Sequence, residues 1–190
     1  MSQIDEDIRL ACETMRKGGI ILYPTDTVWG IGCDATCSDA VRRVYEIKQR
    51  ADSKALIVML SDVDILDRYV EQVPDVAYDL IDLSVKPLTI IYDRALNLAP
   101  ELLADDGSVG IRVTNEEFSK RLCRAYRRPI VSTSANVSGH PTASNYSQIS
   151  DEIKSQMDYI VKSRREDDTA HSPSSVIKLG ADGTVKIIRK

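Results

Sequence analysis

Short apolar runs, each three to six residues long and bounded by glycine, proline or polar residues, recur along the whole chain. A run of this length favours a buried strand, because a helix needs about ten residues or more to cover a core. Segments with apolar residues at helical spacing lie between the runs, as in an α/β fold. The runs cover residues 20–23, 55–60, 88–92, 109–113 and 130–132, with 176–179 and 185–188 further along.

The last two runs flank Gly180-Ala-Asp-Gly183, which predicts an antiparallel hairpin with a four-residue loop. An antiparallel pair in an alternating α/β chain implies a mixed sheet rather than an all-parallel one. A chain of 190 residues with 43% hydrophobic content can bury one sizeable core. We therefore expect a single α/β domain over residues 1–190.

Residue patterns also predict where helices begin and end. Gly18-Gly19 should end a first helix near Lys17, since glycine adopts the left-handed conformation that often follows a helix. Ser38 is expected to cap the next helix, and Ser61-Asp62 to open another.

Two later helices have their own signals. Pro74 is expected in the first turn of a helix that ends near Leu83. Thr114 and Glu117 have the spacing of a capping box, which predicts a helix through Tyr126.

Charge and composition exclude several classes of protein. With 25 basic and 29 acidic residues the net charge is −4, the wrong sign for a protein that coats nucleic acid nonspecifically. No apolar run approaches about 18 residues, and the N-terminal segment is acidic where a signal peptide would be basic and then apolar. We therefore expect a cytoplasmic protein that does not engage a membrane.

The four cysteines, Cys12, Cys33, Cys37 and Cys123, are too sparse for a disulfide scaffold in a chain of this length. Cys33 and Cys37 lack a second pair or a nearby histidine, so small buried thiols are favoured over zinc ligands. No metal ligands are expected from the protein.

The first candidate binding segment, Tyr23 to Gly32, follows the first predicted strand. Its glycines allow close approach of the backbone, and the hydroxyls of Thr25 and Thr27 can donate hydrogen bonds to a small ligand. A plain turn explains the same glycines. No glycine-rich stretch is followed by Gly-Lys-Ser/Thr, so a Walker-type phosphate loop is absent.

Three cations, Lys48, Arg50 and Lys54, lie within seven positions at the end of the next predicted helix. They could clamp a triphosphate, because arginine offers a planar fork and lysine a compact charge. A solvated helix C-terminus, where basic residues offset the dipole, explains them equally well.

Hydroxyl and amide side chains crowd the segment that follows the run at 130–132. They are Ser132, Thr133, Ser134, Asn136 and Ser138. This density suits recognition of an oxyanion or a phosphate by neutral donors, although the same residue types also cap helices and fill turns. A serine hydrolase is not expected, because the chain lacks Gly-x-Ser-x-Gly and its two histidines, His140 and His171, lie in polar segments.

Two arginines, Arg112 and Arg189, lie in predicted strands among apolar residues. Such a residue either faces solvent or binds an anionic partner, because burying a lone charge is costly. Facing solvent is the simpler interpretation. The polar stretch from Ser163 to Ser174 follows no period and is a candidate mobile loop.

Taken in order, these segments resemble the YrdC/TsaC family of threonylcarbamoyl-AMP synthases. The resemblance extends from about Ile4 to Arg189 and implies a twisted α/β fold around a central, positively lined cavity. The motifs that carry it are Pro24-Thr-Asp-Thr-Val-Trp-Gly-Ile-Gly, Lys48-x-Arg50, Pro87-Leu-Thr-Ile-Ile, Gly110-Ile-Arg-Val, Ser132-Thr-Ser-Ala-Asn-Val-Ser-Gly and Ser174-Ser-Val-Ile.

The resemblance assigns residues to two ligands. Those expected to bind threonine are Thr27, Met59, Arg112, Ser132 and Ser174, with Met59 standing where many members have histidine. Those expected to bind ATP are Lys48, Arg50, Lys54, Ser108, Ser134, Asn136, Thr142 and Arg189. Lys48 and Arg50 would be the most critical, and no side chain would act as a nucleophile.

The implied reaction joins threonine, bicarbonate and ATP into threonylcarbamoyl-AMP and releases pyrophosphate, through positioning and electrostatic stabilisation. Mg²⁺ is expected as the cofactor, held chiefly by the triphosphate. The product would serve N6-threonylcarbamoyladenosine modification of tRNA through a downstream threonylcarbamoyl transferase complex. The chain itself would meet tRNA only indirectly or weakly.

Two alternatives remain open. A basic face on one predicted helix is compatible with an RNA-binding module of the same fold, for example for double-stranded RNA, although the chain is acidic overall. That face consists of Lys120, Arg121, Arg124, Arg127 and Arg128. The other alternative is a carbamoyl-transfer enzyme related to hydrogenase maturation, in which a similar domain lies within a much longer chain.

Overall fold

A single sheet organises the computed structural model, which describes residues 2–49, 56–169 and 171–190. Its strands are β1 (Ile21–Tyr23), β2 (Gly30–Gly32), β3 (Ile57–Leu60), β4 (Leu88–Tyr92), β5 (Val109–Val113), β6 (Ile130–Ser134), β7 (Tyr159–Ile160), β8 (Ser175–Leu179) and β9 (Val185–Arg189). Their order across the sheet is β7-β1-β2-β6-β3-β5-β4-β8-β9. The pairs β1–β7, β3–β5 and β4–β8 are parallel and the other neighbours are antiparallel. The predicted α/β fold with a mixed sheet is confirmed.

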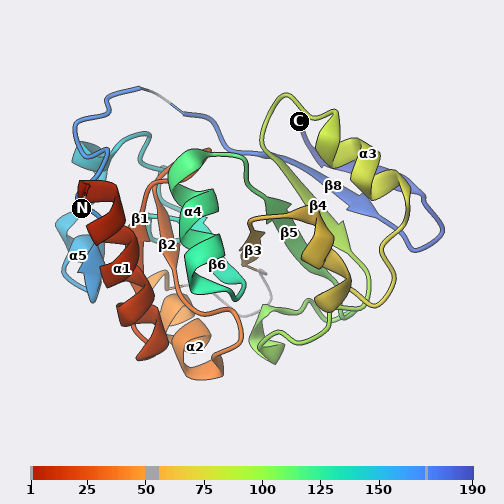
Figure 1. The fold of residues 1–190 in the computed structure, drawn as a ribbon, viewed down its shortest axis with the longest axis horizontal. Helices are drawn as coiled ribbons and strands as arrows, with labels where there is room; N and C mark the ends of the chain where they lie inside the picture. The colour runs from red at the N-terminus through yellow and green to blue at the C-terminus, as the bar shows by residue number, and fades with distance from the viewer. Residues whose placement is uncertain (1, 50–55, 170) are drawn as a thin grey trace.

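Helices flank this sheet. Those in the described residues are α1 (Gln3–Arg16), α2 (Ser38–Ile47), α3 (Val76–Asp82), α4 (Glu117–Tyr126) and α5 (Asp151–Lys154), with the 3-10 segments η1 (Val63–Arg68), η2 (Pro100–Leu102) and η3 (Tyr146–Gln148). Helices α1 and α4 pack side by side at the end of the molecule that holds β1 and β2, whereas α3 lies toward the end that holds β4, β8 and the C-terminus (Figure 1). None of the described helices is both long and apolar enough to cross a membrane.

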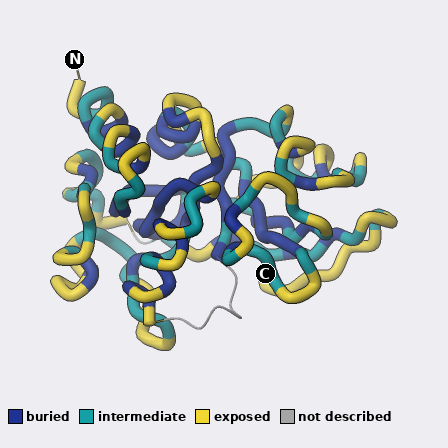
Figure 2. Tube along the Cα trace, turned by 90° about the horizontal axis from the view of Figure 1, so that it is seen from below, coloured by how far each residue is buried: buried dark blue, intermediate teal, exposed yellow. Residues whose placement is uncertain are grey.

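The core lies between the sheet and its helices. Buried segments run through the middle of the molecule and exposed ones lie at its periphery (Figure 2). The inward face of α1 consists of Ile8, Ala11, Cys12 and Met15, each at most 7% exposed. At the edge of the sheet, β9 is exposed along its whole length. The centre of the sheet is therefore rigidly packed and its β9 edge is not.

Several predicted boundaries are confirmed. Helix α1 ends at Arg16, shortly before Gly18, whose φ of +77° is the left-handed conformation expected there. Strands β4 and β5 span the predicted residues, and α4 ends at Tyr126. Strands β8 and β9 form the predicted antiparallel hairpin, with residues 180–184 between them instead of a four-residue loop.

Three predicted helix starts differ from the structure. Ser38 does not cap α2; it is the first helical residue, after the N-cap Cys37. The segment that opens after Asp62 is the 3-10 segment η1 and not an α-helix. Helix α3 begins at Val76, two residues beyond Pro74. Short polar residues favour helix starts in general, but they do not fix which of several neighbours takes the cap position.

The predicted capping box at Thr114 and Glu117 is wrong, because Glu116 caps α4 instead. The Glu116 carboxylate accepts hydrogen bonds from the backbone N–H groups of Phe118 (3.1 Å) and Ser119 (2.8 Å). The Thr114 hydroxyl accepts from the Glu116 N–H at 3.2 Å and so braces the turn that leads into the cap. A glutamate in this role is uncommon, which is why the pattern pointed to Thr114.

Strand β2 was predicted only as loop. A Cβ on Gly32 would lie 2.6 Å from the ring carbon Cε1 of Tyr23 and 2.9 Å from the carbonyl oxygen of Val131, so this strand position accepts only glycine. Glycine is depleted in strands, and the pattern therefore concealed β2. Because β2 pairs with the end of β6, through Gly30 with Ser134, β6 runs two residues beyond its predicted end.

A buried carboxylate on α1 anchors the chain that follows β7. Asp7 has no exposed surface, and it accepts hydrogen bonds from the Tyr159 hydroxyl (2.5 Å), the N–H groups of Lys162 (3.0 Å) and Ser163 (2.8 Å), and the Ser163 hydroxyl. Burial raises the pKa of Asp7, but these hydrogen bonds outweigh it, so the pKa lies below its ordinary value of 3.8. The ionised form of Asp7 therefore holds the start of the 163–174 loop against α1.

We expect Asp7→Asn to lower the free energy of unfolding at neutral pH by about 2 to 4 kcal/mol, because an amide accepts more weakly and its NH₂ group opposes the donors. The carboxylate stabilises the fold at pH values above 3.8, and this contribution is lost as the pH falls through the lower pKa of the folded state. Acidification below about pH 4 should therefore cost the parent more stability than the variant. Urea unfolding at neutral pH and in acid measures both effects.

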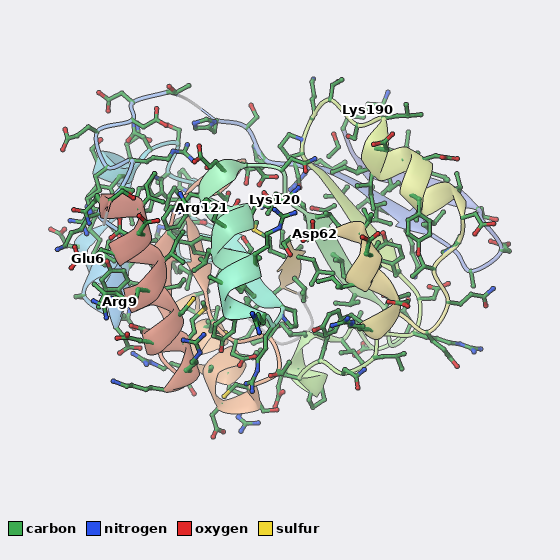
Figure 3. All side chains as sticks on the ribbon, viewed as in Figure 1. Glu6, Arg9, Asp62, Lys120, Arg121 and Lys190 are labelled. Atoms are coloured by element: carbon green, nitrogen blue, oxygen red, sulfur yellow. The ribbon has the colours of Figure 1, made fainter. Side chains whose placement is uncertain are left out.

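Glu6→Gln is the matched control, since Glu6 lies on the same helix (Figure 3) and its carboxylate accepts no hydrogen bond from residues 159–163 in the described structure. Equal unfolding midpoints for the two variants would contradict the anchoring role of Asp7.

Candidate functional site

A cavity of about 370 Å³ lies against one face of the sheet. Its described lining includes eight hydroxyl side chains, two arginines and no carboxylate. These polar residues are Thr27, Thr89, Ser108, Arg112, Ser132, Thr133, Ser134, Thr142, Ser174 and Arg189. Neutral donors together with guanidinium groups make a cavity that suits an anionic ligand.

The strand pleat explains why these side chains converge. Cross-strand register aligns Ser132 of β6, Ile57 of β3, Gly110 of β5 and Ile91 of β4 in one row across the sheet. Residues paired in this way point to the same face, and so do their neighbours two positions along each strand. Arg112 therefore shares the face of Gly110. The absence of a side chain at Gly110 leaves room in the middle of this row.

Arg112 is buried, with 3% of its surface exposed, so the expectation that it faces solvent is wrong. Its Nη2 lies 3.1 Å from Oδ1 of Asp26, and this ion pair offsets the cost of burial. Burial raises the pKa of Asp26, and the charge of Arg112 opposes that rise. Within the described structure Nε of Arg112 has no hydrogen-bond partner. The buried guanidinium therefore retains an open donor.

The loop after β1 presents Thr27 to the cavity and uses Thr25 to hold itself in shape. Thr25 Oγ1 donates to the carbonyl oxygen of Val28 at 2.7 Å, accepts from the Thr27 N–H at 3.0 Å and lies 3.1 Å from Thr27 Oγ1. Arg164, in the 163–174 loop, donates to the carbonyl oxygen of Thr25 at 3.3 Å and forms an ion pair with Glu116 at 3.1 Å. Of the two threonines considered as ligand donors, only Thr27 lines the cavity.

Ser174 closes the opposite side of the cavity and is held from two directions. Its hydroxyl lies 2.8 Å from the hydroxyl of Thr89, and both side chains are buried. Its carbonyl oxygen accepts from Nε (3.0 Å) and Nη2 (2.8 Å) of Arg189. Arg189 thereby connects the edge strand β9 to the end of the 163–174 loop.

The hydroxyl-rich end of β6 is held by Lys48, which is 1% exposed. Its Nζ donates to the carbonyl oxygens of Ser134 (2.6 Å) and Asn136 (2.7 Å). The Asn136 amide donates in turn to the carbonyl oxygen of His140 at 2.8 Å. Lys48 and Asn136 thus shape the turn after β6, and neither lines the cavity.

A sequence profile of the Sua5/YciO/YrdC family, described as "Telomere recombination", matches residues 13–190. This chain belongs to that family. It is 34% identical over 157 residues to a threonylcarbamoyl-AMP synthase of Pseudoalteromonas translucida, covering 81% of this chain and 84% of the relative. It is 33% identical over 190 residues to the threonylcarbamoyl-AMP synthase of Homo sapiens, covering 97% of this chain and 67% of the relative.

The crystal structure of P. abyssi Sua5 complexed with L-threonine has a similar fold, with a TM-score of 0.80 and 26% sequence identity. The similarity covers 90% of this chain and 50% of the Sua5 chain, so this chain spans about half the length of that protein.

The structure brings together only some of the residues that the YrdC/TsaC resemblance assigned to ligands. Those that line the cavity are Thr27, Ser108, Arg112, Ser132, Ser134, Thr142, Ser174 and Arg189. Met59 is fully buried outside the cavity lining, with its sulfur 3.9 Å from the Tyr23 hydroxyl. Arg50 and Lys54 lie outside the described residues.

Two residues of the site were not anticipated. Asp26 lies between the two threonines of the first motif, and it pairs with Arg112. Thr89 is a buried hydroxyl within the apolar strand β4. Arg112 was singled out because it is an isolated polar residue in an apolar strand. The same criterion would have identified Thr89.

Potential metal ligands do not cluster in the part of the chain that the structure describes. Among the described residues, no group of three or more His, Cys, Asp or Glu side chains could hold a metal ion. Cys33 is fully buried and Cys37 is half-buried, and both are free thiols.

We expect Gly32→Ala to destabilise the fold by about 1 to 3 kcal/mol, because its Cβ would press on the Tyr23 ring and on backbone. Gly110→Ala should cost less than about 1 kcal/mol, since its Cβ would lie 3.3 Å and 3.4 Å from the side-chain methyl groups of Ile57 and Thr89 beside the cavity. Thermal unfolding of both variants measures the difference. A larger loss for Gly110→Ala would show that the cavity floor is packed more tightly than described.

Proposed function

We propose that this chain is a threonylcarbamoyl-AMP synthase, which forms L-threonylcarbamoyladenylate and pyrophosphate from L-threonine, bicarbonate and ATP. The observation that carries the proposal is the open Nε donor of Arg112, buried in the same cavity as the hydroxyls of Thr27 and Ser174. A buried guanidinium with an unused donor favours an anionic ligand, and a carboxylate matches its planar fork. The named relatives in the family support threonine as the amino acid.

At the threonine end, Arg112 would bind the carboxylate while Thr27 and Ser174 meet the amine and the side-chain hydroxyl. Thr89 would keep the Ser174 hydroxyl oriented through their 2.8 Å contact. Ser132 would add a donor from the neighbouring strand. Met59 would act on this end only through Tyr23, whose hydroxyl it contacts.

At the nucleotide end, the hydroxyls of Ser108, Ser134 and Thr142 and the guanidinium of Arg189 would bind ATP. Lys48 and Asn136 would support this end by fixing the turn after β6, since Lys48 already donates to its carbonyl groups. Arg50 and Lys54 remain predicted phosphate ligands.

The chemistry needs positioning rather than a protein nucleophile. The threonine amine attacks the carbon of bicarbonate and water leaves, which gives a carbamate. A carbamate oxygen then attacks the α-phosphorus of ATP, and the bond to pyrophosphate breaks. By holding the carboxylate, Arg112 leaves the amine directed toward the reacting carbon. The hydroxyl groups and Arg189 would stabilise the charge that develops at the phosphates.

Mg²⁺ would neutralise part of the triphosphate charge. The described lining fits this arrangement, because it contains no carboxylate and the ion would therefore be held by nucleotide oxygens. The product would pass to a threonylcarbamoyl transferase complex for N6-threonylcarbamoyladenosine modification of tRNA.

Pyrophosphate release should require threonine, bicarbonate and ATP together. The test is an assay in which each substrate is omitted in turn and the adenylate is identified by mass. Pyrophosphate release that continues at the full rate with ATP alone would show a different hydrolytic activity, and the proposal would fail.

We expect Arg112→Ala to raise the KM for threonine by about 30- to 1000-fold, equivalent to about 2 to 4 kcal/mol, and to change the KM for ATP far less. Arg189 provides the matched comparison. Arg189→Ala removes the other cavity arginine, and it should weaken the binding of ATP rather than the binding of threonine. Arg189→Lys should also impair ATP use, since an ammonium group cannot replace the fork.

All three variants should be assayed well below their unfolding midpoints, because Arg112→Ala also leaves the buried Asp26 carboxylate without its ion-pair partner. If either substitution raised the KM for threonine and the KM for ATP equally, the cavity would not be divided into the two ends described.

A further inference from the structure

A second hollow lies on the opposite face of the sheet, between the C-terminal end of α4 and η1. Its volume is about 280 Å³. Leu60 of β3 lines it, whereas Ile57, three positions earlier in the same strand, lines the first cavity. Because successive side chains alternate between faces, the two hollows lie on opposite sides of the sheet.

Four guanidinium groups surround this hollow, and two of them already have acidic partners. Arg124 binds Asp62 through a 2.6 Å contact, and Arg128 binds Asp34 at 3.0 Å. The side chains of the other two, Arg68 and Arg127, donate no hydrogen bond and form no ion pair within the described structure. The hollow therefore has unneutralised positive charge in a chain whose net charge is −4.

The backbone at Arg127 is a second, independent observation. Arg127 ends α4 with φ of +61°, in the left-handed region. Glycine is the usual residue here, because a Cβ makes this conformation unfavourable. The chain keeps a long cationic side chain at a position where glycine would favour the fold. A strained residue with an unpaired charge beside a hollow suggests that the side chain has a use.

The floor of the hollow is apolar. Leu60, Ile65 and Cys123 line it with apolar side chains, and Tyr69 lines it as well. Helix α4 and η1 stand next to one another on this face, with Asp62 and Lys120 close to the space between them (Figure 3). Guanidinium forks around a partly apolar hollow suit the tetrahedral oxygens of a phosphate group, which two arginines can share.

We propose that this hollow is a second anion site, in which Arg68 and Arg127 bind a phosphate group. The phosphate could belong to a small polyphosphate anion or to the backbone of an RNA, since the recognising chemistry is the same. The site is separate from the proposed threonine and nucleotide ends, and it does not depend on the proposed reaction.

The test follows backbone amide signals of the ¹⁵N-labelled protein during titration with pyrophosphate and, separately, with a short RNA duplex. The amide signals of Tyr69, Arg127 and Arg128 should shift saturably. Signals of residues 132–134 report the first cavity in the same spectra and keep the two sites distinct. Shifts with pyrophosphate alone indicate a small anion, and tighter binding of the duplex at these same amides indicates RNA.

Arg127→Gly is the decisive variant, because it removes the guanidinium and relieves the left-handed strain together. It should raise the unfolding midpoint by about 2 to 4 °C and weaken anion binding at this site by about tenfold or more. Arg68→Gln should weaken binding without the gain in stability. Arg94 is an exposed arginine outside this hollow and forms an ion pair with Glu71. Arg94→Gln should therefore change neither the unfolding midpoint nor anion binding at this site. The proposal is overturned if neither ligand shifts these amides, or if Arg127→Gly binds as the parent does.

Discussion

The ion pair between Arg112 and Asp26 is the constraint on which the site depends. Three strands, β2, β6 and β3, separate the strand of Arg112 from the strand that leads to Asp26, a span of about 19 Å across a flat sheet. Twist of the sheet and the reach of the loop bring the two charges within 3.1 Å. The ion pair thus ties the loop after β1 to β5, the strand whose Gly110 and Arg112 line the cavity.

Pleat alternation explains which parts of the site were predictable. Arg112, Ser132 and Ser134 were marked because each is a polar residue at the end of, or inside, an apolar run, and strand geometry then places them on one face. The same reasoning recovered β4, β5 and the final hairpin. The role of Ser174 came only from the family resemblance. Strand β2 escaped because its need for glycine is set by the Tyr23 ring on the paired strand β1 and not by its own local pattern.

Residues whose role depends on a specific neighbour were harder to predict. The pattern of cations did not reveal that Lys48 is buried and donates hydrogen bonds to backbone carbonyl groups at the turn after β6. The cap of α4 was assigned to Thr114, although the carboxylate of Glu116 accepts from the N–H groups of Phe118 and Ser119 in the first turn. Charge and spacing identify a segment, but the partner of each side chain is decided by tertiary packing.

The two cavity arginines differ in how firmly the fold holds them. Arg112 extends from a central strand with neighbours on both sides, whereas Arg189 belongs to β9, which has one neighbour and is exposed throughout. Binding of a ligand therefore costs less side-chain conformational entropy at Arg112 than at Arg189. The proposed amino-acid end would thus be preorganised and the proposed nucleotide end adaptable, an asymmetry that would favour selectivity for the smaller ligand and tolerance toward the larger one.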